Sequence, residues 1–198
     1  LISHLTITGG YGGGVYLLYS TDIYLDHITV SENIGSGITS IGYSYNELTN
    51  SKIINNTTTG SGGGITGNAL RAENVIISGN SAAYSGGGVS TFSGNSYNAI
   101  KLYGFILSNN SAGSVGGGIN IDGRTYLQDG IISNNSASSN GGGLYITGLA
   151  ANAHICNVTI KNNVAGQSAG GAYIRGAPTL TASSCYPTFL RCNIFSNS

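Results

Sequence analysis

A short run of glycines returns seven times along this 198-residue chain, and its third position is glycine in every copy. These third glycines are Gly14, Gly37, Gly64, Gly88, Gly118, Gly143 and Gly171, and successive copies lie 23 to 30 residues apart. A repeat of that length without helical spacing is typical of a solenoid, in which each coil is one structural unit. Most recurring residues are therefore expected to build coils, and function is to be sought in residues that do not recur.

Each glycine run follows a stretch whose alternate positions are apolar. One clear copy carries Phe105 and Leu107, another carries Gly130 and Ile132, and a last, incomplete copy begins at Phe195. Alternation that is rich in β-branched residues predicts a strand with one buried face. Strands that stack about 4.8 Å apart then give a parallel β-helix of about seven coils, roughly 34 Å long. The prediction is one all-β domain over residues 1–198, with an irregular loop at 176–190.

Asparagine recurs three residues after the second apolar position, at Asn33, Asn56, Asn80, Asn110, Asn135 and Asn163. Gly10 and Ser198 take this place in the first and last copies. Stacked amides pair donor to acceptor along parallel strands, so we expect a buried ladder at a corner. The glycines should turn a tight corner by positive φ or close backbone approach. Because Ser36 and Ala169 replace other glycines of the run, we expect the strictest backbone demand at the third one.

The combined pattern is an aliphatic residue, two spacers, Asn, a spacer, Ala, the glycines and another aliphatic residue. It resembles the repeats of polymorphic outer-membrane proteins and related autotransporter passengers, which carry Phe-x-x-Asn and Gly-Gly-Ala-aliphatic tetrapeptides. Ile132-x-x-Asn135 matches the first with an aliphatic in place of Phe, and Gly170-Gly171-Ala172-Tyr173 matches the second loosely. The resemblance covers nearly the whole chain and implies a right-handed parallel β-helix at a cell surface, often serving adhesion.

Composition narrows the class of partner. Charged residues make up only 7% of the chain, with seven acids and seven bases. No basic patch emerges, so nucleic acid is not an expected partner, and no cofactor is predicted. Thirteen tyrosines and the absence of Met and Trp suit an extracellular or cell-surface protein. Because the chain opens and closes within the repeat pattern, we expect a section of a longer chain without a membrane span, or a subunit whose ends meet neighbours.

Three cysteines, Cys156, Cys185 and Cys192, lie in the last quarter of the chain. Cys156 and Cys192 open similar strands one coil apart and are candidates for a disulfide, whereas Cys185 and Cys192 could instead close the irregular loop. The third interpretation is that some of them are small buried apolar residues. Their spacing fits no zinc-ligand pattern, so no metal site is predicted there.

Few residues offer candidate catalytic chemistry. Asp26 and Glu73 fall in one column two coils apart, with Thr49 between them, which corresponds to about 9.6 Å. Because carboxylate pairs at about 5–9.5 Å hydrolyse glycosides, a carbohydrate-active enzyme is the rival function. Asp122 and Asp129 bracket a turn that could hold calcium, although two carboxylates are a small ligand set.

Two outward columns are candidate contact surfaces. Ile76, Ile106 and Ile131 fall in one column of successive coils and should form an apolar strip, which we call the isoleucine stripe. The column after the glycine corner contains Tyr16, Tyr145 and Tyr173 among threonine and other polar residues. The tyrosines interrupt that column, which argues against a flat ice-binding face of threonine.

The recurring residues build scaffold, and almost none of the others forms a catalytic pattern. The leading hypothesis is therefore a non-enzymatic surface protein with an adhesive or structural role. Its partner would be a protein or glycan on another surface, or copies of itself. Alternatives are the carbohydrate-active enzyme and a self-assembling filament or sheath, since open strand edges pair readily with another chain.

Overall fold

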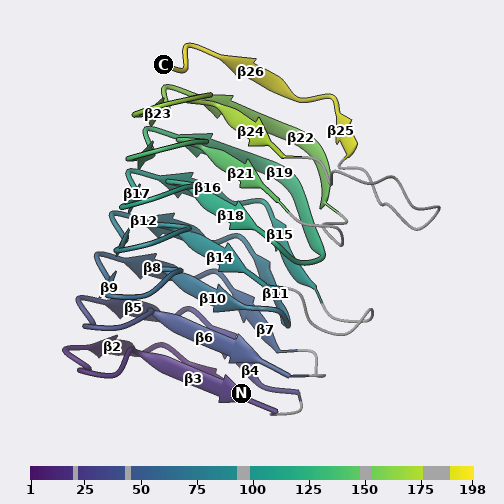
Figure 1. Ribbon diagram of the computed structural model, residues 1–198. Coiled ribbons are helices and arrows are strands. Elements are labelled where there is room, and N and C mark those ends of the chain that lie inside the picture. The colour runs from purple at the N-terminus through teal and green to yellow at the C-terminus, as the bar shows by residue number, and fades with distance from the viewer. Residues whose placement is uncertain (20–21, 43–45, 93–98, 148–152, 176–187) are drawn as a thin grey trace.

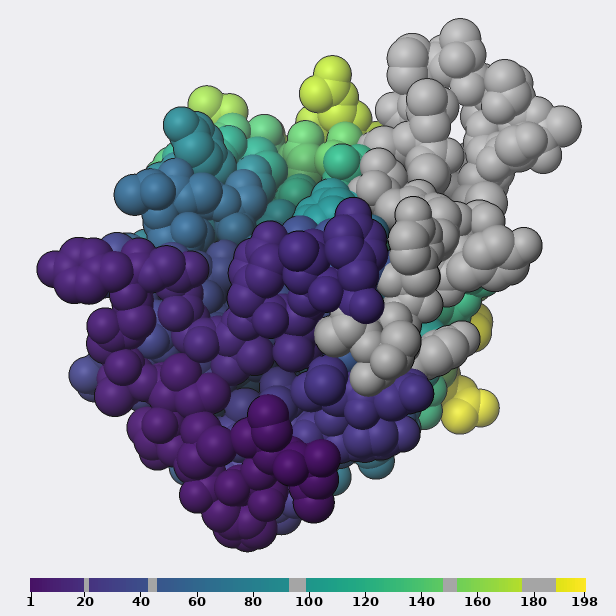
Figure 2. All heavy atoms as spheres, turned by 90° about the horizontal axis from the view of Figure 1, so that it is seen from below, coloured from purple at the N-terminus to yellow at the C-terminus, as the bar shows by residue number. Residues whose placement is uncertain are grey.

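The computed structural model describes residues 1–19, 22–42, 46–92, 99–147, 153–175 and 188–198. Within these ranges every regular element is a β-strand, and all strand pairs are parallel. The chain climbs one coil at a time from its N-terminus to its C-terminus (Figure 1). Viewed from below, the first coils lie in front and later coils stack behind them (Figure 2). No helix in the described ranges is long and apolar enough to cross a membrane.

The described residues form three sheets that run along the solenoid. The largest has 14 strands in two runs, which join in the long strands β19 (Thr125–Ser133) and β22 (Ala153–Lys161). The first run adds β1 (Ile2–Ser3), β4 (Tyr24–Asp26), β7 (Glu47–Thr49), β11 (Leu70–Glu73), β15 (Ile100–Tyr103) and β25 (Thr188–Leu190). The second run adds β2 (Thr6–Thr8), β5 (Thr29–Ser31), β8 (Lys52–Ile54), β12 (Ile76–Ser78), β16 (Ile106–Ser108) and β26 (Asn193–Phe195).

The other two sheets lie on either side of the glycine corner. The seven-stranded sheet contains β3 (Val15–Leu18), β6 (Ile38–Ile41), β10 (Ile65–Gly67), β14 (Val89–Thr91), β18 (Ile119–Ile121), β21 (Leu144–Ile146) and β24 (Ala172–Ile174). The five-stranded sheet contains β9 (Thr57–Thr58), β13 (Ser81–Ala82), β17 (Ser111–Ala112), β20 (Ser136–Ala137) and β23 (Val164–Ala165). The predicted all-β parallel helix is therefore confirmed. Seven strands in one file correspond to about six full turns, slightly fewer than the predicted seven coils.

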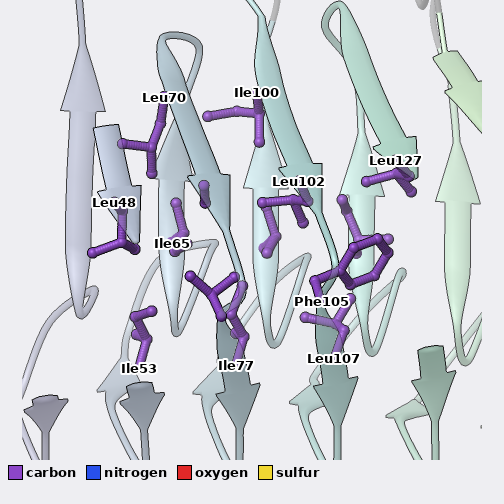
Figure 3. Packing of buried hydrophobic residues seen from close by; sticks show 14 of the residues in the cluster. Leu48, Ile53, Ile65, Leu70, Ile77, Ile100, Leu102, Phe105, Leu107 and Leu127 are labelled. Carbon is purple, nitrogen blue, oxygen red and sulfur yellow. The ribbon is translucent and has the colours of Figure 1, made fainter. Parts of the chain in front are cut away.

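Inward side chains of the sheets form one continuous core. Equivalent residues of successive coils lie in one column along the solenoid, as Ile53, Ile77 and Leu107 do in Figure 3. All three are fully buried. In the other inward column of the same run, a large residue lies beside a small one: the ring of Phe105 occupies the space where a side chain at Gly130 would stand. Alternation along each strand thus leaves the opposite columns free to face outward.

The asparagine ladder is confirmed. Each ladder amide donates from Nδ2 to Oδ1 of the next coil's asparagine, and Asn110 donates to Asn135 in this way at 3.0 Å. The same Oδ1 also accepts a backbone N–H from the coil before, so every step carries two hydrogen bonds. The last step ends at Asn197, not at Ser198 as predicted, because Ile194, rather than Phe195, is in register with Ile160.

The glycine corner corrects one prediction. Positive φ occurs at the first glycine of the run, as at Gly116 (φ 64°), and Ala169 adopts it too (φ 56°). The third glycine has no positive φ; it is required for space. A Cβ at Gly118 would stand 2.5 Å from the carbonyl oxygen of Gly143 and 3.1 Å from Nδ2 of Asn135. Close approach of coil to coil, rather than backbone strain, therefore keeps this position glycine.

Left-handed residues mark two further corners of each coil. One column precedes the ladder and includes Asn109 and Asn134, both with φ 57°. The other separates the two runs of the large sheet; its members, with φ of 50–57°, are His4, His27, Asn50, Asn74, Gly104, Asp129, Asn157 and Arg191. Asn, Asp and Gly tolerate this conformation best. The second column, here called the corner column, borders the candidate site.

Candidate functional site

The outer surface of the first run gathers charged and aromatic residues, and we call it the polar face. One outward column reads Tyr24, Glu47, Arg71, Lys101, Tyr126, His154 and Thr188. The next reads Asp26, Thr49, Glu73, Tyr103, Gln128, Cys156 and Leu190. These residues change from coil to coil, so they are not needed to form the solenoid. The polar face is thus a surface on which the residues are free to serve a function other than folding.

A hollow of about 290 Å³ lies on this face. It is lined by Arg71, Glu73, Asn74, Tyr103, Gly104, Gln128 and Asp129. Gly104 belongs to the corner column, where the coils before and after it carry Asn74 and Asp129. Gly104 adds no side chain between those two neighbours, and Oδ1 of Asn74 reaches to 2.8 Å from the position that a Cβ at Gly104 would take.

Arg71 organises one side of the hollow. Its guanidinium contacts the carboxylate of Glu73 at 2.6 Å and that of Glu47 at 3.8 Å. It also lies over the ring of Tyr103, 5.2 Å from the ring centroid. A planar guanidinium that is paired and stacked in this way is held in one orientation. The wall of the hollow at β11 and β15 is therefore preorganised.

Asp129 forms the other side. Its carboxylate accepts hydrogen bonds from Nδ2 of Asn157 at 2.6 Å and from Nε2 of Gln128 at 2.9 Å. These two bonds, that of Asn157 first, hold the pKa of Asp129 below its ordinary value. The group thus stays ionised at neutral pH and presents acceptor oxygens to the hollow.

Beside the hollow, Tyr126 is surrounded by cationic groups. The Nζ of Lys101 lies 5.8 Å from the ring centroid, and the guanidinium of Arg124 lies 5.6 Å from it. The ring of His154 stacks on Tyr126 at 4.9 Å with an interplanar angle of 14°. We call these four residues the Tyr126 cluster. It joins aromatic surface to positive charge, an arrangement that attracts anions.

The predicted acid pair is in one column, as expected, with Thr49 between Asp26 and Glu73. The carboxylate of Asp26 accepts hydrogen bonds from Thr49 and Asn50 and contacts Nδ1 of His27. These contacts, that of Thr49 first, lower the pKa of Asp26 far below its ordinary value. A glycosidase general acid needs the opposite shift, toward a raised pKa.

Asp122 and Asp129 do not bracket a short turn, so the geometry does not favour the calcium alternative. Asp122 precedes β19, whereas Asp129 lies past its first half, at the far side of the polar face. Burial raises the pKa of Asp122, which disfavours the charged form that a cation would need. Among the described residues, no three His, Cys, Asp or Glu side chains group closely enough to hold a metal ion.

The isoleucine stripe is formed as predicted. Ile76, Ile106 and Ile131 pair in register on the outer surface of the second run. Ile106 is 41% exposed and Ile131 is 37% exposed. Lys52 and Thr159 bound the stripe at its two ends.

The three candidate tyrosines do not form one surface. Tyr16 is exposed on β3, at the N-terminal end of the seven-stranded sheet. Tyr145 and Tyr173 stack at 5.3 Å near the other end, and Tyr145 is buried. Thr39 is in register with Tyr16, so the threonines and tyrosines do share a column, as predicted.

The prediction that Cys156 and Cys192 occupy equivalent positions one coil apart is wrong. Cys156 faces outward in register with Leu190, whereas Cys192 comes two residues later and packs against the core. Both thiols are free, so they are not joined to each other. Cys185 lies outside the described residues, as does most of the predicted loop at 176–190. Thr188–Leu190, however, form strand β25.

Sequence reasoning missed the hollow and the residues around it. A usable signal was present: Gly104 replaces the histidine, asparagine, aspartate or arginine that every other coil carries in the corner column. Tyr103 and Arg71 stand beside that gap in outward columns that no recurring motif marks. Without strand register, nothing related Arg71 to Tyr103, which lies 32 positions later in the chain.

Comparison with curated proteins and with solved structures found no match. The family model described as a right handed beta helix region matches residues 1–155. It agrees with the parallel coils and supplies their handedness, while the narrower resemblance to autotransporter passengers stays a prediction. The chain belongs to the right-handed β-helix family.

Proposed function

We propose that this chain is a non-enzymatic, extracellular surface domain that binds a glycan at the Gly104 hollow and so serves adhesion. The observation that carries the proposal is the lining of the hollow: one aromatic ring with carboxylate and amide groups on both sides. Sugar hydroxyls bond well to carboxylates and amides, and their apolar C–H faces pack on aromatic rings. Such a combination suits a polyhydroxylated ring better than an apolar ligand.

Binding is favoured over hydrolysis by the state of the carboxylates. Hydrogen-bond donors, Thr49 first for Asp26 and Asn157 first for Asp129, lower the pKa of these two carboxyls, and Glu73 is paired with Arg71. Ionised carboxylates accept hydrogen bonds from sugar hydroxyls, whereas a general acid has to hold a proton near neutral pH. The ionised state of these carboxylates thus supports recognition of hydroxyl groups better than proton donation by the same carboxylates.

The test fills the hollow without straining the backbone. In Gly104→Asn, the new residue takes a φ of 57°, which Asn74 (55°) and Asn157 (53°) already adopt in the same column. The new Cβ would stand 2.8 Å from Oδ1 of Asn74, so the flexible amide of Asn74 has to turn aside. We expect normal folding and at least about a tenfold loss of affinity for immobilised glycans, because the new side chain occupies the ligand's place. Gly79→Asn is the matched control, since Gly79 (φ 68°) also replaces asparagine in a left-handed column but lies beyond the hollow.

Retained binding in Gly104→Asn would contradict the proposal, as would equal losses in the two variants. Turnover decides between binding and the enzymatic alternative, which the shared column of Asp26 and Glu73 favours. Incubation with acidic and neutral polysaccharides should release no new chain ends. Release that Asp26→Asn or Glu73→Gln abolishes would replace the adhesive function with a glycosidase or lyase.

A further inference from the structure

We propose that one corner of the solenoid is a site of N-linked glycosylation, with Asn55, Asn109 and Asn134 as the residues that carry the sugars. Each of them begins the motif Asn-x-Ser/Thr, which N-glycosyl transfer requires in secreted proteins. We call these three residues the acceptor column. The inference rests on the extracellular location that we propose, and it does not depend on the Gly104 hollow.

The acceptor column is exposed along one edge of the coils. It belongs to the left-handed column that precedes the asparagine ladder, and its three φ angles are 56°, 57° and 57°. All three residues are exposed. The hydroxyl residues of the motifs are exposed as well and share the outward column of the five-stranded sheet: Thr57, Ser111 and Ser136. A sugar on these amides therefore has open solvent in front of it.

Two other motifs of this kind do not suit a sugar. Asn56 is fully buried, and its Nδ2 donates to Oδ1 of Asn80 and to the carbonyl of Val30, both at 3.0 Å. A sugar on that nitrogen would break the ladder. The Nδ2 of Asn157 lies 2.6 Å from a carboxylate oxygen of Asp129, so a sugar there would be pressed against a charged group. The fold thus divides five sequence motifs into three open sites and two obstructed ones.

The acceptor column lies in a part of the chain that has almost no charge. No Asp, Glu, Lys or Arg occurs in residues 53–70, 74–100, 104–121 or 130–160. Charged side chains normally keep a protein surface soluble and apart from its neighbours. N-linked sugars are bulky and solubilising. They would give this edge of the solenoid the solubility that charge gives to other surfaces.

The alternative explanation is that the motif is a by-product of the repeat. The left-handed position favours asparagine, the ladder requires a second asparagine, and an exposed strand accepts serine. Ser81 is consistent with that explanation, because serine occurs there although Gly79 leaves its coil without an acceptor. The two explanations differ in whether the folded protein carries sugar.

The reaction is the transfer of an oligosaccharide from a lipid pyrophosphate donor by a transferase of the host cell. A bond forms between Nδ2 of the asparagine and C1 of the first sugar, and the bond between C1 and the pyrophosphate oxygen breaks. The lipid pyrophosphate leaves with the electron pair, and the amide nitrogen gives up one proton. Whether transfer comes before or after folding, only a sugar on an open amide is compatible with the folded coil.

Peptide mass spectrometry of protein from the cells that make it locates mass added to individual asparagines. We expect sugar at Asn55 and at one or both of Asn109 and Asn134, which lie one coil, about 4.8 Å, apart. We expect none at Asn56 or Asn157. The intact mass should exceed the mass of the unmodified chain accordingly.

Variants made in the same cells test the motif itself. Ser111→Ala and Ser136→Ala leave the asparagines in place but should abolish sugar at Asn109 and Asn134, respectively, because the motif loses its hydroxyl. Ser81→Ala is the matched control, since Ser81 lies in the same column and belongs to no motif. It should leave every sugar in place.

A gain of sugar is the complementary test. Gly79→Asn completes a motif with Asn80 and Ser81, at a position whose φ of 68° suits asparagine. The new Cβ would meet Oδ1 of Asn55, the flexible end of a side chain that can turn aside. We expect added mass at position 79 in this variant, and its absence in Gly79→Asn/Ser81→Ala.

The outcomes separate this inference from the proposed function. An unmodified mass for the native protein would overturn the inference and leave binding at the Gly104 hollow untouched. Sugar at Asn56 or Asn157 with none on the acceptor column would overturn it too, as would equal loss of sugar in Ser111→Ala and Ser81→Ala. Sugar on the acceptor column of a protein that binds no glycan would uphold the inference and overturn the function proposed for the hollow.

Discussion

Replacing Asn110 by alanine should destabilise the solenoid by about 3 kcal/mol, because this amide makes four hydrogen bonds in a dry environment. It accepts from the backbone N and from Nδ2 of Asn80, at 2.9 and 3.1 Å. It donates to Oδ1 of Asn135 and to the carbonyl of Ile77, both at 3.0 Å. Asn110 itself is 1% exposed, so water does not reach the vacated positions.

The magnitude follows from the donors that the substitution leaves without an acceptor. Oδ1 of Asn135 keeps the backbone N–H of Asn110, so that acceptor stays satisfied. The backbone N–H of Asn80 and one N–H of its amide lose their acceptor. An unsatisfied buried donor costs about 1–3 kcal/mol, which gives about 2–6 kcal/mol for two, and the expected value of about 3 kcal/mol lies in the lower half of that range. Against a total stability of about 5–15 kcal/mol, this is a large effect.

Urea unfolding followed by circular dichroism gives the free energy and its m-value. The m-value matters because a solenoid is stabilised between neighbouring coils, and a weakened central step can uncouple the two ends. The control is Asn109→Gly. Asn109 is the exposed neighbour with φ 57°, and the same column already contains Gly9 and Gly79. Its replacement should change stability by less than about 1 kcal/mol.

Equal destabilisation by Asn110→Ala and Asn109→Gly would refute the reasoning, since only the first removes ladder hydrogen bonds. A loss below about 1 kcal/mol for Asn110→Ala would refute it as well. Such a result would mean that water or a rearranged Asn80 replaces the lost acceptor at little cost.

Three further outcomes are expected. Gly118→Ala should destabilise by about 3 kcal/mol and Gly116→Ala by about 1–2 kcal/mol. A Cβ would meet a carbonyl oxygen at both sites, that of Gly143 at 2.5 Å and that of Ile119 at 2.6 Å. The Gly116 column, however, already holds Ala169 at φ 56°, whereas the Gly118 column holds only glycine. Equal urea midpoints would contradict this expectation. Replacing the three residues of the isoleucine stripe with threonine should keep the fold and weaken self-association, measured by sedimentation, or adhesion, measured by cell binding. If both are unchanged, the stripe is an ordinary half-exposed strand surface. The pKa of Asp26 is lowered in the folded state, so the stability that its ionised carboxylate contributes is complete above the unfolded pKa of about 3.9 and is lost as pH falls below that value. Asp26→Asn should therefore reduce the drop in thermal midpoint between pH 6 and pH 2. An equally large drop in the variant would contradict this expectation.

The scaffold was predictable because each coil repeats the same demands. The inward files, the buried amides and the third glycine recur at fixed offsets, so one copy explains the others. The prediction failed in the last copy, which was aligned with the copy before it without knowledge of the strand register. Ile194 rather than Phe195 continues the core, and that one-residue shift moves the ladder from Ser198 to Asn197. In a strand, such a shift exchanges the inner and outer faces.

The candidate site was not predictable in the same way. Its members come from β11, β15 and β19, and loops of unequal length separate these strands along the chain. Only hydrogen-bond register brings Arg71 beside Lys101 and Lys101 beside Tyr126. The acid pair could be predicted because two carboxylates in one column are a known catalytic motif that can be looked for in a sequence. A hollow made by the absence of a side chain has no such chemical signal.

The corner column explains why a hollow forms where it does. Left-handed backbone at every coil restricts the column mostly to asparagine, aspartate, histidine and glycine, and only glycine among these leaves space. Gly79 lies in the other left-handed column, where the side chain of Asn55 takes the place of a Cβ at Gly79. Its neighbours on β12 and β16 are Ser78 and Ser108, which bond to each other at 3.2 Å. At Gly104 the neighbours are an aromatic ring and fixed charges instead. A backbone requirement of the solenoid thus decides where a pocket can open, and the outward columns beside it decide what the pocket can bind.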